Sequence, residues 1–239
     1  MLVGGFPAGP WGTNCYVIAT EPGAECVIVD PGKDSAGGIE ELVSEHGLKP
    51  VAVLLTHGHI DHVWSVVPVC GTRGIPAFIH PNDRAMLSDP LSAMSPQSVD
   101  MLASMTEGRL AMGEPDDIRL LEDALTISVA GLDFIVEHAP GHTGGSVMFR
   151  RAETTEDPTV LLSGDVLFEG SIGRTDLPGG DHSQMLNSLR TKVLPLADTT
   201  VVLPGHGGTT TIGRERLSNP YLTTLAADGG APSATNRGL

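Results

Sequence analysis

The chain has 239 residues, of which 40% are hydrophobic and 4% aromatic, which excludes a disordered chain and is enough to bury a sizeable core. Its 14 basic and 29 acidic residues give a formal charge of −15, which argues against nucleic acid as a partner because phosphate groups would be repelled. No apolar run reaches the about 18 residues that a membrane-spanning helix needs, so we expect no membrane partner.

The amino-terminal third alternates strand-like and helix-like segments. The apolar run Val51–Leu55 is continuous and predicts a strand that is covered on both faces. A helical pattern that begins at Ser35 is expected to end at Gly47, a residue that commonly closes helices. In chain order we predict strands over 14–19 and 25–29, a helix over 35–46, a strand over 51–55, a helix over 63–71 and a strand over 76–79.

The segment from Asn82 to Asp117 differs in character, because it is rich in Met, Ser, Asp and Pro and has only weak helical periodicity. We interpret it as a helical excursion that lies over one edge of the fold. It is either a lid on a site or a surface packing segment, and the second interpretation is the one we favour.

The rest of the chain is mostly strand. Ala130-Gly131 joins two strand patterns and predicts a hairpin. Residues 226–239 are rich in Gly, Ser and Ala and are expected to form a flexible tail. With no linker or repeat before them, residues 1–225 are predicted to form one domain. The remaining predicted elements are strands over 124–129, 132–138, 146–149, 159–162 and 200–203 and helices over 183–193 and 213–217.

The sequence T-H-G-H-I-D-H at 56–62 comes directly after the predicted buried strand. In an extended segment the side chains of His57 and His59 point to the same side, because side chains alternate along the strand. Asp61 and His62 begin the following helix and can face the same cavity. Imidazole and carboxylate together suit Zn²⁺, Fe²⁺ or Mn²⁺, so this cluster predicts a metal site.

Three later residues, His142, Asp165 and His206, complete the set. Each comes just after a predicted strand, near a glycine that lets the backbone turn sharply. Seven ligand-type side chains are enough for two metal ions if Asp165 bridges them. The expected ligands are His57, His59, His142 and Asp165 for one ion and Asp61, His62, His206 and Asp165 for the other.

The order T-H-x-H-x-D-H, then His, Asp and His, resembles the pattern of the metallo-β-lactamase superfamily from about Asn14 to Tyr221. The resemblance implies an α/β fold, a four-layer αββα sandwich with the metals at one edge of its two sheets. The segments 171–181, 204–207 and 219–222 make the chain similar to short bacterial glyoxalase II-like hydrolases. That similarity implies a thioesterase for hydroxyacyl thioesters such as S-lactoylglutathione.

The implied cofactors are two divalent ions, zinc in the first place, with iron or manganese as alternatives. A hydroxide bridging the ions would attack the thioester carbonyl, and the thiolate would leave without a strong acid because thiol pKa values are near about 8.5. Asp61 would bind the second ion and orient the hydroxide. Arg174 would contact a substrate carboxylate or form an ion pair with Asp176 or Asp181. Asp30 would support the metal loop or simply form a turn.

Some features depart from the known branches. Glyoxalase II proper has an extra C-terminal helical domain with basic residues for glutathione, whereas only 218–239 follow the last motif here. β-Lactamases of this fold usually have Cys where Asp165 stands and carry secretion signals, which argues against that branch. The Gly-Arg-Thr-Asp sequence at 173–176 is also similar to iron-dependent persulfide dioxygenases, which gives the alternative function. A non-catalytic metal-binding protein is a third alternative.

Cys15, Cys26 and Cys70 are odd in number and lack C-x-x-C spacing, so we expect reduced, buried thiols. The amino terminus lacks the charged and apolar regions of a signal peptide. Both observations predict a cytoplasmic protein. We expect a small-molecule thioester as its partner, and either a monomer or a homodimer.

Overall fold

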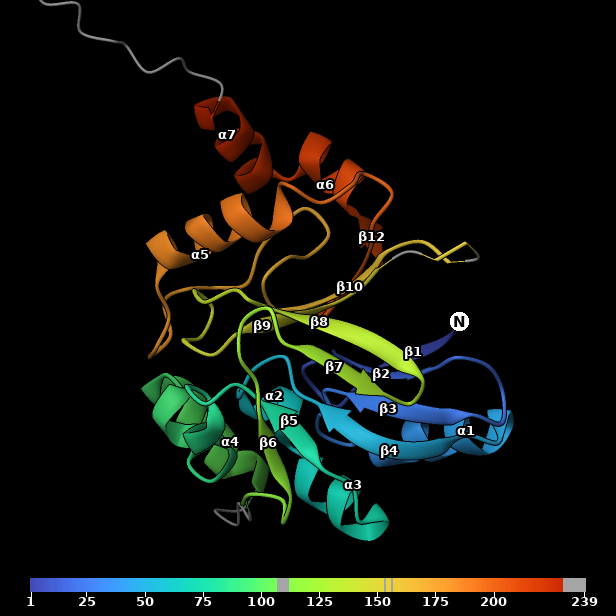
Figure 1. The fold of residues 1–239 in the computed structure, drawn as a ribbon. Coiled ribbons are helices and arrows are strands. Elements are labelled where there is room, and N and C mark those ends of the chain that lie inside the picture. The colour runs from blue at the N-terminus through green and yellow to red at the C-terminus, as the bar shows by residue number, and fades with distance from the viewer. Residues whose placement is uncertain (107–111, 153, 156, 230–239) are drawn as a thin grey trace, which may run out of the picture.

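Two six-stranded β-sheets lie face to face, and helices cover the outer face of each (Figure 1). The computed structural model describes residues 1–106, 112–152, 154–155 and 157–229. This four-layer arrangement is the α/β sandwich that the sequence predicts.

The first sheet has the strand order β1-β2-β3-β4-β5-β6, and the second has the order β12-β11-β10-β9-β8-β7. Strands β3, β4 and β5 run parallel, as do β10 and β11. The first sheet consists of β1 (Leu2–Ala8), β2 (Thr13–Ala19), β3 (Glu25–Val29), β4 (Lys49–Leu54), β5 (Ala77–Ile79) and β6 (Ile118–Leu120). The second consists of β7 (Thr126–Val129), β8 (Leu132–His138), β9 (Val147–Arg151), β10 (Val160–Gly164), β11 (Val201–Pro204) and β12 (Thr210–Thr211).

The helices lie on the two outer faces. Helices α1 (Ala36–His46), α2 (Ile60–Val63) and α3 (Val66–Arg73) belong to the side of the first sheet, and α5 (His182–Ser188), α6 (Ile212–Ser218) and α7 (Pro220–Gly229) to the side of the second. A five-residue stretch of wider helix, Leu189–Val193, continues α5. The segment after β5 contains two short 3₁₀ helices, Arg84–Leu87 and Pro90–Ala93, and α4 (Pro96–Thr106).

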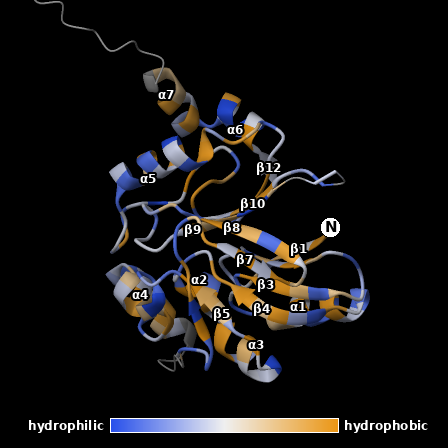
Figure 2. Ribbon diagram, in the orientation of Figure 1, coloured by the Kyte–Doolittle hydropathy of each residue, from blue (hydrophilic) through white to orange (hydrophobic). Residues whose placement is uncertain are grey.

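The apolar core has three layers because each central strand is covered on both faces. In β2, Tyr16 and Ile18 pack between the two sheets, whereas Val17 and Ala19 pack under the helices. This alternation follows from the two-residue period of a strand and explains why β2 lacks a polar face. Figure 2 shows β3, β4 and β5 mostly in hydrophobic colours, whereas α1 and α3 carry both colours.

Several elements differ from the sequence-based predictions. Strand β1 was not predicted, because Gly4, Gly5 and Pro7 interrupt its pattern. It lies at the edge of the sheet, where proline is tolerated. The helix predicted over 63–71 is α3, which begins three residues later than predicted, at Val66. The gap between α2 and α3 contains Ser65, whose hydroxyl donates a hydrogen bond to the Gly32 carbonyl at 2.7 Å. The short strands β6 and β12 were also missed.

The carboxyl-terminal prediction needs a correction as well. Helix α7 continues to Gly229, so the first residues of the tail predicted over 226–239 are helical. Residues 230–239 lie outside the described residues. In the part of the chain that the structure covers, no helix is long and apolar enough to cross a membrane.

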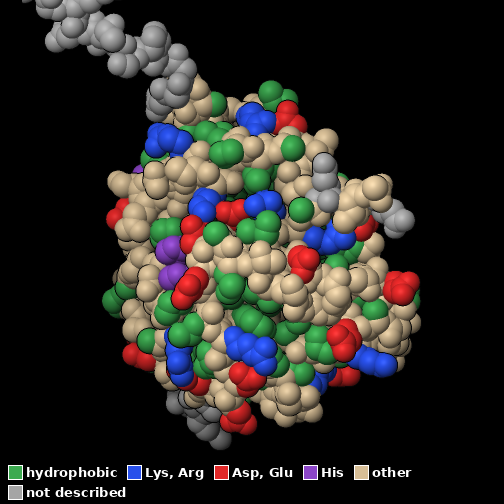
Figure 3. Space-filling model, in the orientation of Figure 1, with side chains coloured by type: hydrophobic (Ala, Val, Ile, Leu, Met, Phe, Trp, Pro, Cys, Tyr) green, Lys and Arg blue, Asp and Glu red, His purple; other side chains and the backbone are tan. Residues whose placement is uncertain are grey.

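The three cysteines are free and buried, as predicted. Burial raises the pKa of the Cys26 and Cys70 thiols to about 12, so neither is a thiolate at neutral pH. At the surface, basic and acidic side chains are interspersed on the face drawn in Figure 3. Charges of opposite sign also pair at the surface: Lys192 forms ion pairs with Asp123 at 2.8 Å and Glu137 at 3.1 Å.

Candidate metal centre

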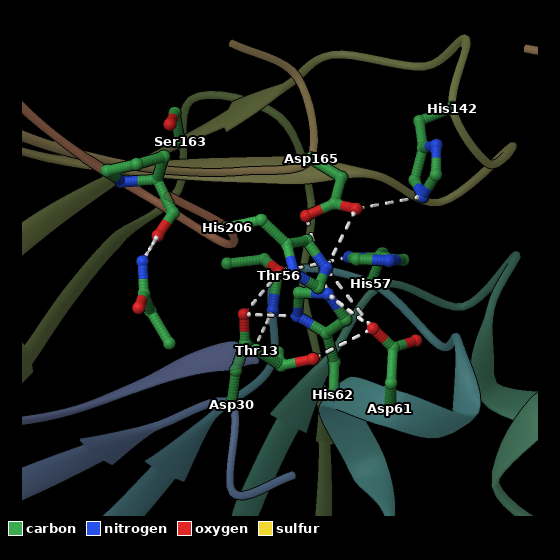
Figure 4. Close-up of polar contacts among 12 residues, drawn as sticks. Thr13, Asp30, Thr56, His57, Asp61, His62, His142, Ser163, Asp165 and His206 are labelled. Carbon is green, nitrogen blue, oxygen red and sulfur yellow. Dashed lines mark hydrogen bonds and ion pairs between the residues drawn. The ribbon is translucent and has the colours of Figure 1, made fainter. Parts of the chain in front are cut away.

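One edge of the sandwich collects the functional side chains. The carboxyl ends of β4, β10 and β11 meet there, and the loop after β8 joins them. Two backbone hydrogen bonds link the sheets at this edge, from Asn14 N to Gly205 O at 2.7 Å and from Val147 N to Thr56 O at 2.8 Å. All seven predicted ligand residues lie together at this edge, and Figure 4 shows Asp165 with His57, Asp61, His62, His142 and His206 around it.

The ligand atoms form three overlapping groups, and within each group they lie within 4.8 Å of one another. Asp165 lies between the others. Its Oδ1 is 3.3 Å from His62 Nε2, and its Oδ2 is 3.5 Å from His142 Nε2 and 3.6 Å from His206 Nε2. The groups are His57, His59 and His142; His57, His62 and Asp165; and Asp61, His62 and His206.

The donor atoms are suited to a cation. Nε2 of His57, His59, His62 and His142 and Oδ1 of Asp165 are buried and make no hydrogen bond within the described residues. A buried polar atom without a partner costs about 1–3 kcal/mol, so a cluster of them with free lone pairs is explained by a group that accepts those lone pairs. Nitrogen and carboxylate donors at this spacing fit divalent transition metals.

Hydrogen bonds behind the cluster fix two of the imidazoles. His62 Nδ1 donates to Asp30 Oδ2 at 2.9 Å, and His142 Nδ1 donates to the Arg174 carbonyl at 2.7 Å. Because carboxylates and carbonyls only accept, both rings carry the proton on Nδ1 and direct the lone pair of Nε2 toward the centre.

Both roles expected for Asp30, forming a turn and supporting the loop after β4, are seen in the structure. Its φ of 48° places it in the left-handed region at the end of β3, so it forms the turn. Its carboxylate also accepts hydrogen bonds from Thr56 N at 2.8 Å and Thr56 Oγ1 at 2.6 Å, besides the bond from His62. The turn therefore supports the loop that carries His57.

Burial and mutual charge set the ionisation of the site. Burial, with the neighbouring imidazoles, lowers the pKa of His57 and lowers that of His59 to about 3. Burial alone would raise the pKa of Asp61, but the nearby His62 and His206 outweigh it and hold that carboxyl ionised. His57 and His59 are therefore neutral, with lone pairs available to a cation. Despite burial, the carboxylates of Asp61 and Asp165 instead raise the pKa of His62 and His206, which would have to release their protons when a metal ion binds.

A cavity of about 410 Å³ opens beside this cluster. Ala93, Met94 and Ser98 from the helical excursion line it, so this segment forms a wall of the site as well as packing on the surface. The interpretation of residues 82–117 as a surface packing segment alone is therefore corrected. The other lining residues are Trp11, Ile60, Phe168, Arg174, Leu177 and five of the seven ligand residues, His59, Asp61, His142, Asp165 and His206.

Arg174 forms one of the ion pairs expected for it, and its contact with a substrate stays a prediction. Its side chain forms a two-pronged ion pair with Asp176, at 2.7 and 2.8 Å, and also lines the cavity. Asp181 is not its partner, because Asp181 caps α5 by accepting a hydrogen bond from Gln184 N at 2.9 Å.

Sequence reasoning missed two residues that contact the ligand loops. Thr13 Oγ1 donates to Asp61 Oδ2 at 2.9 Å, and Asp83 accepts a hydrogen bond from Gly58 N at 2.9 Å. Thr13 lies 48 positions from Asp61, and Asp83 lies 25 positions from Gly58. No local motif marks such partners.

Comparisons with known proteins agree with this geometry. The family model of the metallo-β-lactamase superfamily matches residues 8–206. An uncharacterized protein of Mycobacterium tuberculosis is 46% identical over 95% of this chain and all of its own length. The hydroxyacylglutathione hydrolase GloC of Haemophilus influenzae is 32% identical over 92% of this chain and 97% of its own.

Solved structures show the same fold. The B3 metallo-β-lactamase BLEG-1 is 41% identical, with a TM-score of 0.79 and coverage of 93% of this chain and 100% of its own. TTHA1623, solved in a di-iron-bound form, is 37% identical with a TM-score of 0.72 over 92% and 100% of the two chains. The family match, the two-sheet fold and the cluster of ligand-type residues lead to one conclusion: this chain belongs to the metallo-β-lactamase superfamily.

Proposed function

We propose that this protein is a metal-dependent hydrolase that holds two divalent ions and cleaves thioesters of hydroxy acids. The observation that carries the proposal is the convergence of buried, unpartnered nitrogen and oxygen atoms beside an open cavity. The relationship to GloC supports the substrate class. Zinc is the proposed metal, and the di-iron form of TTHA1623 keeps iron as the alternative.

The proposed assignment follows the geometric groups. His57, His59 and His142 would hold one ion, and Asp61, His62 and His206 would hold the other. Asp165 would be shared between them, because its two oxygens approach His62 and His142. When bound, two such ions lower the pKa of a water to near neutrality and polarise a carbonyl oxygen.

Residues of the chain would orient the attacking water and shield the reacting bond from solvent. The hydrogen bond from Thr13 fixes Oδ2 of Asp61, which leaves Oδ1 to orient an attacking water. Trp11, Phe168 and Leu177 give the cavity apolar walls that suit an acyl or thiol group and displace water from the reacting bond. A thiolate is a good leaving group, so no residue is needed as a strong general acid.

The test is steady-state hydrolysis of S-lactoylglutathione by metal-assayed protein. We expect turnover with about two metal ions per chain, and its loss on chelation. Bound metal without turnover of any thioester would contradict the proposal. A single iron per chain, with oxygen uptake on glutathione persulfide, would support the dioxygenase alternative instead.

β-Lactam hydrolysis is the second candidate function. The sequence argument against it is the Asp at position 165, where β-lactamases of this fold usually have Cys. BLEG-1, named a B3 metallo-β-lactamase, is 41% identical, and this similarity weakens that argument. Hydrolysis of a chromogenic cephalosporin should therefore be measured alongside that of the thioesters. A kcat/KM for the cephalosporin that exceeds the kcat/KM for every thioester would favour this candidate.

Arg174 is proposed to contact anionic substrates at the rim of the cavity. Its side chain is 58% exposed, so solvent and salt screen its charge. We therefore expect Arg174→Gln to raise KM for S-lactoylglutathione only about twofold to fivefold. The KM for a neutral thioester, such as S-lactoyl-N-acetylcysteamine, should stay unchanged. The matched control is Arg119→Gln, because Arg119 is 56% exposed and also pairs with an Asp two positions away. Equal changes for both substrates would refute the role of Arg174.

A further inference from the structure

Asp83 is a fully buried carboxylate outside the seven ligand residues. It lies at the start of the helical excursion, directly before the first 3₁₀ helix, and is 0% exposed. Its Oδ2 accepts hydrogen bonds from Gly58 N at 2.9 Å and Thr143 Oγ1 at 2.6 Å, and its Oδ1 accepts one from Gly145 N at 2.7 Å. All three donors are neutral, and no ion pair found within the described residues includes Asp83. Such a buried charge is costly and needs an explanation.

The three hydrogen bonds join two loops that carry metal ligands. Gly58 lies between His57 and His59 in the loop after β4, and Thr143 directly follows His142 in the loop after β8. One carboxylate therefore connects a loop of the first sheet with a loop of the second. The three imidazoles on these loops form one of the groups with converging ligand atoms.

The packing around Asp83 leaves no space for either loop to shift toward it. A Cβ atom on Gly58 would lie 2.8 Å from the Asp83 carbonyl oxygen and 2.9 Å from Met86 Cβ. A Cβ atom on Gly145 would lie 2.9 Å from Asp83 Cβ. Both glycines are thus held against Asp83 by contact as well as by hydrogen bonds.

The loop after β8 has other supports, but they do not reach the histidines after β4. Asn82 Nδ2 donates to Gly144 O at 3.1 Å, and Thr143 N donates to Ser146 Oγ at 3.1 Å. The first bond ties the loop to the helical excursion, and the second shapes the loop itself. Asp83 is placed differently, because it contacts the backbone between His57 and His59 and the loop of His142 at the same time.

We propose that Asp83 is a positioning residue that sets His57 and His59 against His142 and thereby determines the metal affinity of this half of the centre. The inference rests on the proposed metal-dependent function. Residues that orient metal ligands from behind typically change metal affinity by about 10- to 100-fold when they are replaced.

The experiment compares Asp83→Asn with Glu215→Gln in the full-length protein. Glu215 is a matched control, because it is also 0% exposed and also accepts from three neutral donors, Thr210 Oγ1 at 2.6 Å, Gly170 N at 2.7 Å and Asn219 Nδ2 at 3.0 Å. Zinc affinity is measured by chelator competition, and the visible spectrum of the cobalt-substituted protein reports the geometry of each site. Melting temperature reports stability separately.

For Asp83→Asn we expect one of two zinc ions to bind about 10- to 100-fold more weakly, with an altered cobalt spectrum. Glu215→Gln should lose stability but bind both ions as the wild type does. Equal zinc affinity and an unchanged spectrum in folded Asp83→Asn, or an equal loss in both variants, would overturn the proposal.

A second variant keeps the inference testable if Asp83→Asn does not fold. Thr143→Ala removes one of the three hydrogen bonds and leaves the other two in place, so it should weaken the same ion less than Asp83→Asn does, by about threefold to tenfold. An unchanged affinity in this variant would overturn the proposal as well. If the wild type itself bound no divalent ion, the proposed function would fail, and that result is separate from a failure of the role of Asp83.

Discussion

Asp165→Ala is expected to abolish the binding of both metal ions together with turnover. Asp165 is the residue whose two oxygens approach both groups of imidazoles, with Oδ1 3.3 Å from His62 Nε2 and Oδ2 3.5 Å from His142 Nε2. Loss of the metal removes several kcal/mol of stabilisation of the transition state, so kcat/KM should fall by more than about a thousandfold. Metal content after dialysis and thioester hydrolysis give the two readouts.

The comparison variant is His59→Ala, which should weaken mainly one ion. His59 belongs to the group with His57 and His142 but not to the group with Asp61. We therefore expect about one ion per chain to remain, with much reduced turnover. If Asp165→Ala kept full metal content and activity, the two-ion scheme would be wrong.

Gly205→Ala should have the second-largest effect, although it adds a single methyl group. A Cβ atom at this position would overlap the Asp165 carboxylate and lie 2.8 Å from His62 Cε1. Gly205 is also held by a hydrogen bond from its N to Gly164 O at 2.9 Å, so it cannot move aside freely. We expect about 1–3 kcal/mol of lost stability from overpacking and at least about tenfold weaker metal binding.

Gly37→Ala in α1 is the matched control for this glycine. No atom lies within 4 Å of a Cβ built at Gly37, and the residue is helical, so alanine should stabilise the protein by about 0.5–1 kcal/mol. Melting temperature and metal content distinguish the two variants. Normal metal binding by Gly205→Ala would show that the loop at 204–207 adapts more easily than its packing indicates.

The clustering of the seven proposed ligand residues could be predicted from the sequence because each follows a strand-like run. Four lie within the six residues 57–62, and His142, Asp165 and His206 lie near glycines that mark sharp turns. The fold followed from the same alternation of strand and helix. The predicted strand over 25–29 coincides with β3, and the hairpin at Ala130-Gly131 joins β7 to β8.

Residues that act across the fold could not be predicted in this way. Asp83 and Thr13 are single polar residues in unremarkable surroundings, and their roles depend on which loops the two sheets bring together. Strand β1 was missed for a related reason. Its Gly and Pro residues are unfavourable for an isolated strand, but pairing with β2 over Leu2–Ala8 outweighs that local preference.

The division of the ligands between the two sheets has a consequence for folding. His57, His59, Asp61 and His62 follow a strand of the first sheet, whereas His142, Asp165 and His206 follow strands of the second. On the proposed two-ion scheme, neither half of the chain alone offers a complete set, so high-affinity loading would come after the two sheets have docked. A bound ion would then act as a cross-link at one edge of the sandwich. Its binding energy would oppose separation of the two halves and would couple metal supply to the lifetime of the folded protein.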